Sequence, residues 1–148
     1  MSIPAFISGY SLRIAWKDLE PSKNVYDFSV IDATVSQLQT RNLKLTLEIF
    51  ASDVPEYVIK EADDVIQVRR IQAPAPWDKA ALASWNKFLT ALANHPVYDA
   101  VSKKSIPLNK HPTLTAIDAP IVGLHSLRDI KEVQRNTLII IEKNSYLP

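Results

Sequence analysis

The chain has 148 residues and a formal charge of +1, with 47% apolar and 22% charged side chains. These values are typical of a folded globular chain and exclude disordered and fibrous classes, while the length predicts one domain covering residues 1–148. Nucleic acid and anionic membranes need a clustered basic surface, so neither is expected as a partner of this nearly neutral chain. Because the sequence has no cysteine, disulfides and thiolate chemistry are excluded.

No targeting or membrane segment is recognisable in the sequence. No apolar run approaches the ~20 residues that a membrane-spanning helix needs, and the N-terminus lacks the charged-then-apolar layout of a secretory signal. The sequence therefore predicts a soluble chain and leaves its compartment open.

The first fifty residues predict a strand, a helix and a second strand. Apolar side chains alternate along residues 12–16, the period-2 pattern of a strand. Ser29 and Asp32 are spaced as in a capping box, and apolar residues follow at helical spacing, which predicts a helix from about 30 to 41. Leucine and isoleucine then line one face of a strand over residues 43–49.

The second strand carries polar side chains on its other face, namely Lys44, Thr46 and Glu48. A strand, a helix and a strand at this spacing form a βαβ unit, so the two strands are expected to be parallel. Parallel strands of an open doubly wound sheet are usually apolar on both faces. The polar face is therefore more typical of the interior of a closed barrel, with Glu48 near the carboxyl end of its strand.

An excursion and a long helix are predicted next. Pro55 opens a short helix, and Ile66 and Val68 indicate a brief strand within a proline-containing loop of about 18 residues. Long loops at the carboxyl end of a strand often carry function. Asp78 is expected to cap a helix that has a continuous apolar stripe and ends near residue 94.

The last third of the chain predicts two more strands. Residues 95–113 contain three prolines and three lysines and are expected to form a helix fragment and a loop. The segment "TLTAIDAPIVG" predicts a third strand, "SLRDIKEVQRN" a helix that starts at Ser126, and "TLIIIEKN" a fourth strand.

One group of residues in the first βαβ unit forms a recognisable pattern: Trp16, Leu19, Glu20, Pro21, Tyr26, Asp27, Phe28, Asp32, Leu43 and Leu45. The pattern begins with a strand that ends in Trp and an acidic-Pro turn. It continues with a Tyr-Asp-Phe segment, a helix and a strand of the Lys-Leu-Thr-Leu type. In this order the chain resembles the first βαβ unit of clan A glycoside hydrolases, which are (β/α) barrels, particularly the β-galactosidase-like branch. The resemblance continues through "VPEYV" and residues 75–92, covers 9–94, and extends loosely to 123.

The resemblance implies an α/β fold, a partial (β/α) barrel with three to four parallel strands and flanking helices, related to enzymes that act on β-linked carbohydrates. Such barrels typically need ~250 residues, and the catalytic glutamates of the family follow the fourth and seventh strands. We therefore expect an incomplete and inactive barrel domain, in which residues 95–148 match less clearly. Its open sheet edges are expected to drive self-association. The alternative is a non-catalytic module that binds carbohydrate or another protein.

Candidate catalytic residues must lie at the carboxyl ends of strands. Glycoside cleavage needs one carboxylic acid and a second carboxylate. Glu48, Asp118 and Glu142 qualify by position, and Asp118 and Glu142 are the catalytic candidates among them. Each has a simpler interpretation. Asp118 fits a turn-capping role. Glu142 fits a solvated strand end, because Ile141 stands where the family has Asn before its glutamate.

Five residues are candidates for substrate binding. Arg13 and Glu48 are expected to share one face of neighbouring strands, either as a buried ion pair that braces the barrel or as sugar contacts. Trp77 can stack on a pyranose ring while Asp78 accepts hydroxyl hydrogen bonds, although Trp77 can equally anchor its loop. Trp16 is the fifth candidate, through its place in the family pattern.

No cofactor and no metal are expected. The chain has two glycines and so lacks a glycine-rich phosphate loop, and its three histidines lack the spacing of a zinc site.

Overall fold

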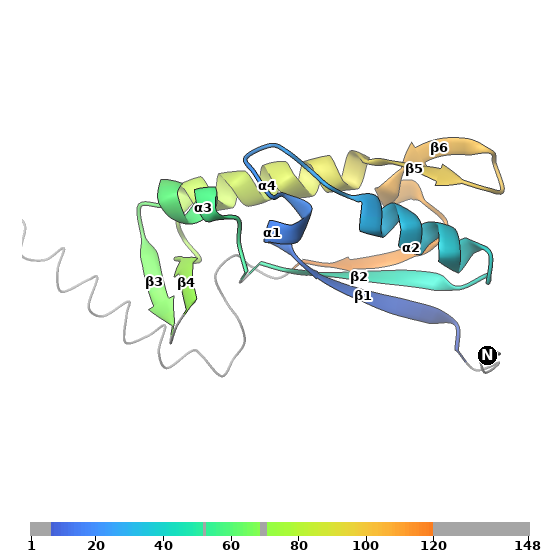
Figure 1. Ribbon diagram of the computed structural model, residues 1–148, viewed down its shortest axis with the longest axis horizontal. Helices are drawn as coiled ribbons and strands as arrows, with labels where there is room; N and C mark the ends of the chain where they lie inside the picture. Colours follow the sequence, from blue (N-terminus) through green and yellow to red (C-terminus); the bar gives the residue numbers. More distant parts are fainter. Residues whose placement is uncertain (1–6, 52, 69–70, 120–148) are drawn as a thin grey trace, which may run out of the picture.

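The computed structural model describes residues 7–51, 53–68 and 71–119, and Figure 1 shows how their elements are arranged. In chain order the elements are β1 (Gly9–Ala15), α1 (Trp16–Leu19), α2 (Ser29–Gln39), β2 (Lys44–Phe50), α3 (Glu56–Glu61), β3 (Val65–Val68), β4 (Ile71–Pro74), α4 (Lys79–Asn94), β5 (Pro96–Asp99), β6 (Lys104–Pro107), the 3-10 helix η1 (Leu108–Lys110) and β7 (Leu114–Asp118).

A three-stranded parallel sheet forms the base of the molecule, in the order β1-β2-β7. Both neighbouring pairs are parallel, which confirms the βαβ unit expected from the first fifty residues and the third strand. The register pairs Arg13 of β1 with Glu48 of β2, and Glu48 with Asp118 of β7. The pairing of β2 with β7 shifts between Leu45 and Thr46, a local irregularity near the amino end of the sheet.

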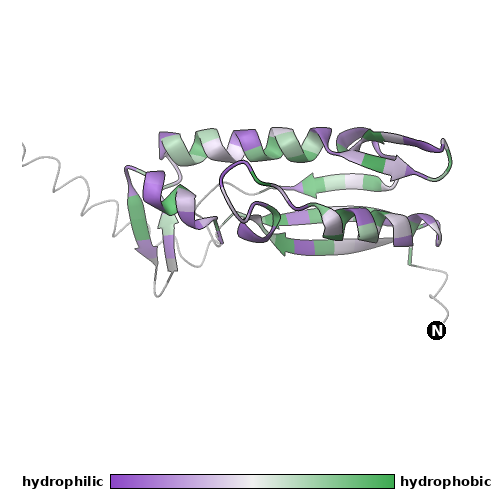
Figure 2. Ribbon diagram, turned by 45° about the horizontal axis from the view of Figure 1, so that its top comes forward, coloured by the Kyte–Doolittle hydropathy of each residue, from purple (hydrophilic) through white to green (hydrophobic). Residues whose placement is uncertain are grey.

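The two long helices, α2 and α4, lie on the same side of this sheet (Figure 1). Alternation along β2 explains why: Leu45, Leu47 and Ile49 are fully buried, whereas the residues between them are partly exposed. Figure 2 shows the corresponding change between hydrophobic and hydrophilic residues along the strands and helices. The apolar face of the sheet therefore packs against the helices, and the polar face is left uncovered by them.

Aromatic rings fill the space between the sheet and α4. Trp16, the first residue of α1, is fully buried, with its ring centroid 4.9 Å from that of Trp85 and 5.5 Å from that of Phe88. Phe88 also approaches Phe28, at 6.3 Å between centroids. Aromatic pairs at these separations add to the free energy gained by burial. The four rings join the end of β1, the start of α2 and the middle of α4 into one core.

The start of α2 differs from the sequence prediction. The N-cap residue is Phe28, and Ser29 and Asp32 form no capping box. Instead, the Asp27 carboxylate accepts a hydrogen bond from the backbone N–H of Ser29 at 3.0 Å, and Asp32 pairs with the ring of His95 at 2.8 Å. The helix itself, Ser29–Gln39, confirms the prediction, because its apolar spacing and not its cap determines which face is buried.

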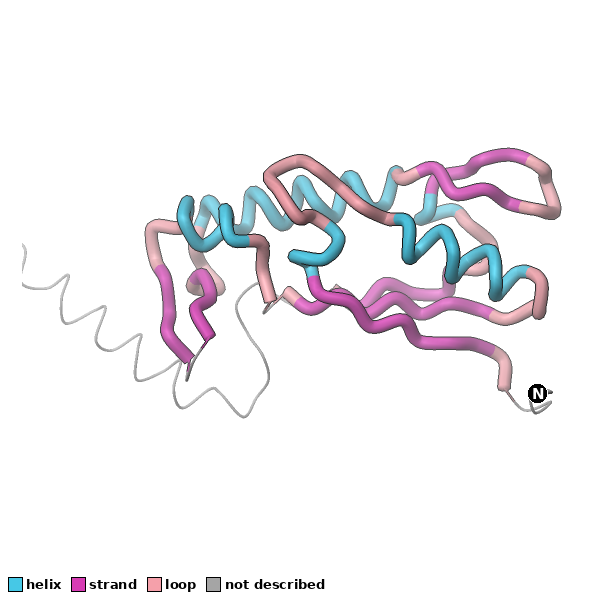
Figure 3. The backbone as a smooth tube through the Cα atoms, viewed as in Figure 1, coloured by secondary structure: helices cyan, strands magenta, loops and turns pink. Residues whose placement is uncertain are grey.

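Two antiparallel hairpins lie at opposite ends of α4 (Figure 3). The β3–β4 hairpin follows α3 and includes Pro74, which was expected in a loop but ends β4 opposite Val65. Residues 95–113, expected to form a helix fragment and a loop, contain the β5–β6 hairpin, in which Pro96 pairs with Pro107 and Asp99 with Lys104, and the helix fragment is limited to η1. Prolines at the outer ends of so short a ladder remove few of its hydrogen bonds.

The remaining sequence predictions fall elsewhere. The predicted helix from Ser126 and the strand "TLIIIEKN" lie outside the described residues. None of the helices in the described ranges combines the length and the apolar character needed to cross a membrane.

Candidate functional site

Charged side chains from all three parallel strands lie in one row near the carboxyl ends of the sheet. Arg13, Glu48 and Asp118 occupy matched register positions on β1, β2 and β7. Because register partners in a parallel sheet point to the same side, the three share one face. This face carries the partly exposed residues of β2 and lies opposite the helices. The row is the candidate functional site.

Arg13 and Glu48 form an ion pair within this row. The Nε of Arg13 donates to Oε1 of Glu48 at 3.0 Å, and the guanidinium lies 3.9 Å from the ring centroid of Phe50. The ion pair expected from the sequence is present, but its side chains are 61% and 32% exposed, so the pair is solvated and not buried as expected. An arginine held by a carboxylate and an aromatic ring has a fixed orientation with further N–H donors to offer.

Asp118 ends β7 directly beside Glu48. Adjacent strands lie about 4.8 Å apart, so the two carboxyl groups start from neighbouring backbone positions. Asp118 is exposed, and within the described part of the chain it has no hydrogen-bond or ion-pair partner. Its carboxylate is therefore available to a ligand, whereas that of Glu48 is engaged by Arg13. Glu142, the other candidate catalytic residue, lies outside the described residues.

Trp16 occupies a core position and not a surface one. Its side chain is fully buried, and its indole Nε1 donates to Oε2 of Glu20 at 2.8 Å. The ring packs on Trp85 and Phe88, and no face of it is open to solvent. Trp16 therefore packs in the core beside the end of β1 and is not part of the exposed row of Arg13 and Asp118.

Asp78 and Trp77 lie next to each other but have different surroundings. Asp78 is buried and accepts from the backbone N–H of Ala81 at 2.8 Å, of Asp63 at 2.8 Å and of Asp64 at 3.0 Å. Burial raises the pKa of Asp78, but these hydrogen bonds outweigh it, so that the pKa is lower than usual. Asp78 thus caps α4, as predicted, with both carboxylate oxygens engaged.

Trp77 is 43% exposed, and its Nε1 donates to Oδ2 of Asp64 at 3.1 Å. The hydrogen bond fixes the indole while leaving part of its surface in solvent. The β3–β4 hairpin that precedes it lies at the carboxyl edge of the parallel sheet, beyond the ends of β1 and β2 (Figure 1). Trp77 lies in the short segment between β4 and α4, and no contact joins it to the charged row among the described residues.

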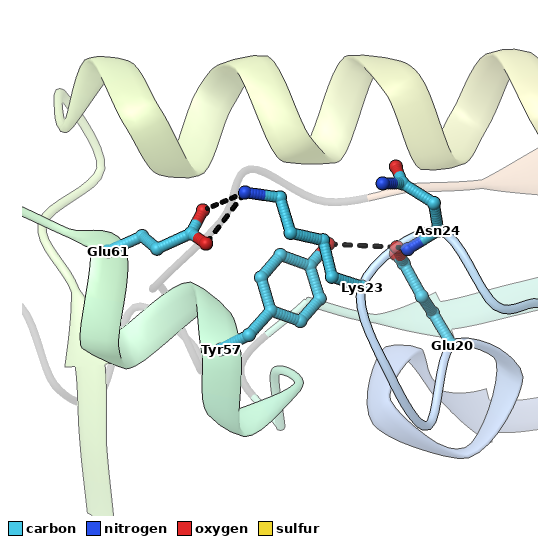
Figure 4. A network of polar contacts seen from close by, with 5 residues as sticks. All are labelled: Glu20, Lys23, Asn24, Tyr57 and Glu61. Atoms are coloured by element: carbon cyan, nitrogen blue, oxygen red, sulfur yellow. Dashed lines mark hydrogen bonds and ion pairs between the residues drawn. The ribbon is translucent and has the colours of Figure 1, made fainter.

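A polar network joins the segment after β1 to helix α3 (Figure 4). Glu20, which is buried, accepts from the Tyr57 hydroxyl at 2.9 Å and from the backbone N–H of Asn24 at 2.9 Å. Lys23 forms an ion pair with Glu61 at 2.6 Å. Burial raises the pKa of Tyr57, and its hydrogen bond to Glu20 raises it further.

This network was not predicted from the sequence, although Glu20 belongs to the family pattern. Two further contacts link the same part of the chain: Lys17 of α1 pairs with Asp53 at 2.8 Å, and the Lys17 backbone N–H donates to the Asp53 carbonyl at 3.2 Å. Together these contacts hold the segment after β1 against the segment after β2. The sequence offers no other signal for this network, because the burial of Glu20 with several donors is visible only in the structure.

Metal binding has no support from the described residues. Nowhere in the described ranges do three His, Cys, Asp or Glu side chains lie close enough to share an ion.

The fold and the site define an α/β protein with a parallel sheet and a charged row at its carboxyl edge. A family model described as beta-galactosidase, glycoside hydrolase family 42, matches residues 10–99. The match spans more than half of the chain, so the chain belongs to this family, and the resemblance found in residues 9–94 is confirmed. Membership indicates a glycoside-hydrolase-like function on β-linked sugars. No curated protein matches the chain.

Proposed function

We propose that the chain contributes consecutive strands of a (β/α) barrel and that the open face of its sheet contacts a β-linked sugar. The observation that carries this proposal is the row of Arg13, Glu48 and Asp118 at matched positions on three parallel strands. In such barrels the substrate is bound at the carboxyl ends of the strands. Family membership and the right order of strand, helix and strand support the same interpretation.

Each member of the row has a role that its surroundings support. The fixed guanidinium of Arg13 donates to sugar hydroxyls, and the free carboxylate of Asp118 accepts from them. Glu48 positions Arg13 through the 3.0 Å hydrogen bond. Phe50, whose ring lies beneath the guanidinium, helps to hold Arg13 in this orientation.

We further propose that these strands bind sugar without completing a catalytic pair. Retaining hydrolysis needs two carboxyl groups about 5–5.5 Å apart, one of them protonated and the other free to attack. Glu48 and Asp118 start from neighbouring positions, but Glu48 is engaged by Arg13. Asp118 alone can act as an acid or as a nucleophile but not as both in one step.

The experiment is a panel of aryl β-glycosides tested for release of the aryl group, with sugar binding followed in parallel by calorimetry. We expect saturable binding that weakens in Asp118→Asn and Arg13→Ala, no release of the aryl group, and no effect of Asp63→Asn. Asp63 is the matched control, because it is an exposed acid of the same edge outside the row. Turnover abolished by Asp118→Asn or Glu142→Gln would contradict the proposal of an inactive site, and absence of binding would contradict the proposed sugar contact.

A second candidate function is carbohydrate binding through Trp77. The observation that favours it is the 43% exposed indole held by Asp64. Aromatic rings fixed in this way present a flat apolar surface to a sugar ring. Binding that is lost in Trp77→Ala but kept in Trp77→Phe would favour this site over the row, and Tyr98→Ala is a matched control because Tyr98 is exposed on the distant β5–β6 hairpin.

Protein association through the sheet edge is the third candidate. Among the described residues β1 pairs only with β2, so one edge of Gly9–Ala15 presents backbone groups to a further strand. We expect a second copy of the chain as the partner and a dimer mass by light scattering at micromolar concentration. Ser11→Lys places a charge on this exposed strand and is expected to reduce the mass to that of a monomer, whereas a monomeric parent chain would overturn the idea.

A further inference from the structure

A cavity of about 390 Å³ lies between the start of β1 and the end of α2. Its walls come from Tyr10 on β1, Leu38 on α2 and Leu43 in the turn before β2. This volume is in the range of small-molecule pockets. The cavity is at the amino end of the strands, so it is separate from the charged row at their carboxyl ends (Figure 1).

The walls are mainly apolar. Leu38 is buried at the base, Leu43 packs against the core, and the partly exposed Ile7 and Tyr10 contribute the rim. Tyr10 is 54% exposed, so much of its ring surface is open to a ligand. Apolar surface of this kind favours a ligand with a hydrophobic body.

One positive charge borders the cavity, that of Arg41. Among the described residues, no acidic side chain lines the cavity and Arg41 has no ion-pair partner. Its backbone is fixed by the end of α2: the Arg41 N–H donates to the Leu38 carbonyl at 3.1 Å, and the Leu43 N–H donates to the same carbonyl at 2.9 Å. Asn42 between them has a positive φ of 54°, typical of a helix C-terminus.

We propose that this cavity binds a small amphipathic carboxylate. The hydrophobic body packs against Leu38, Leu43 and Tyr10, and the carboxylate pairs with the Arg41 guanidinium, whose planar fork of N–H donors matches two carboxylate oxygens. Gln37, one helical turn before Arg41, lines the same cavity and supplies an amide donor. An apolar pocket with a few convergent polar groups is the usual form of a small-molecule site.

A purely structural role for Arg41 predicts something different. A cation at the end of a helix stabilises it through the helix dipole. In that case Arg41→Gln lowers the free energy of unfolding but leaves any ligand affinity unchanged. Binding and stability must therefore be measured on the same variants.

The test uses the full chain with two probes of similar size, 4-phenylbutyrate and its neutral analogue 4-phenyl-1-butanol, titrated by calorimetry. We expect both probes to bind and the carboxylate to bind more tightly. Arg41→Gln is expected to lower the affinity for 4-phenylbutyrate by about fivefold, which is the effect of one solvated ion pair. The affinity for the alcohol is expected to stay unchanged. Arg41→Lys keeps the charge and is expected to retain most of the affinity.

Two controls separate the outcomes. Lys87→Gln removes an exposed cation on α4, outside this cavity, and is expected to change neither affinity. Thr34→Phe adds a ring at a residue that lines the cavity and is expected to abolish binding of both probes. Failure of both probes to bind the parent chain would overturn the proposal, and so would an equal loss of both affinities in Arg41→Gln.

Discussion

The hydroxyl of Tyr57 donates to Oε1 of Glu20 at 2.9 Å, and this hydrogen bond joins the loop after β1 to the helix after β2. The Glu20 carboxylate receives two more N–H donors, from Trp16 and Asn24, so it is buried with three neutral partners. A buried carboxylate needs such donors because its desolvation is costly. The contact between the segment after β1 and α3 thus includes one buried acid that belongs to the family pattern.

Tyr57→Phe tests this dependence. The substitution keeps the ring but leaves Glu20 with two donors, so we expect the free energy of unfolding to fall by about 1–2 kcal/mol. Urea denaturation followed by tryptophan fluorescence measures the change. Tyr98→Phe is the control, because Tyr98 is exposed and the same hydroxyl is lost there without effect. Equal stabilities of Tyr57→Phe and the parent chain would show that the Glu20 hydrogen bond is energetically neutral.

Asp78→Ala is expected to be more damaging than an ordinary loss of a helix cap. Removal of an N-cap side chain costs about 1 kcal/mol and up to about 2, and here the N–H groups of Asp63 and Asp64 lose their acceptor as well. We therefore expect the free energy of unfolding to fall by about 2 kcal/mol in thermal or urea denaturation. Asp78→Asn keeps one acceptor oxygen, so its free energy of unfolding should lie between that of the parent chain and that of Asp78→Ala.

Asp63→Ala provides the matched comparison for Asp78→Ala. Its side chain is exposed, and its role in the cap is through its backbone N–H, which the substitution retains. We expect its stability to stay within about 0.5 kcal/mol of the parent value, as for most surface substitutions. A loss as large as that of Asp78→Ala would mean that the loop conformation and not the cap governs stability here.

The ion pair of Arg13 and Glu48 is expected to contribute little. Because the two side chains are 61% and 32% exposed, a double-mutant cycle with Arg13→Ala and Glu48→Ala should give a coupling of about 0.2–1 kcal/mol that decreases with salt. The function of the pair is then to orient Arg13 and not to brace the sheet. A coupling of about 3 kcal/mol at high salt would instead indicate a buried pair.

Most of the parallel layer could be predicted from the sequence, because its signals are local. Alternation along β2 separates Leu45 and Leu47 from Thr46 and Glu48, and the structure buries the first pair and not the second. The spacing of apolar residues likewise places α2 and α4. The expectation that Arg13 and Glu48 share one face of neighbouring parallel strands is also confirmed, since the two residues are register partners.

The features that could not be predicted depend on contacts between distant residues. Ser29 and Asp32 have the spacing of a capping box, yet Asp32 forms a hydrogen bond with His95, 63 residues away in the sequence. The β5–β6 hairpin has no alternating pattern, and its turn is fixed by Asp99, which accepts the N–H of Ser102 at 2.9 Å, and by Lys103 with a φ of 56°. Solvent exposure of Arg13 was missed for the same reason, since it depends on what covers the polar face.

Asp99 also gives the chain a pH dependence that can be measured. Hydrogen bonds from Ser102, together with those from Val101 and Gln39, outweigh partial burial and lower the pKa of Asp99 from 3.8 to about 2. A lowered pKa means that the folded state holds the carboxylate ionised more strongly than the unfolded state does. The stabilisation is therefore fully present above about pH 4 and is lost as the pH falls through about 2.

We accordingly expect the free energy of unfolding to fall between pH 4 and pH 2, and the fall to be shallower in Asp99→Asn, which has no proton to gain. Urea denaturation at steps of pH, followed by circular dichroism, gives both curves. Gln39→Ala removes the 2.7 Å hydrogen bond to Oδ1 and should reduce the slope in part, because the other donors remain. If Asp99 is responsible, the slope of stability against pH must decrease when this group can no longer titrate. Superimposable curves for the parent chain and Asp99→Asn would therefore show that other carboxyl groups account for the acid sensitivity.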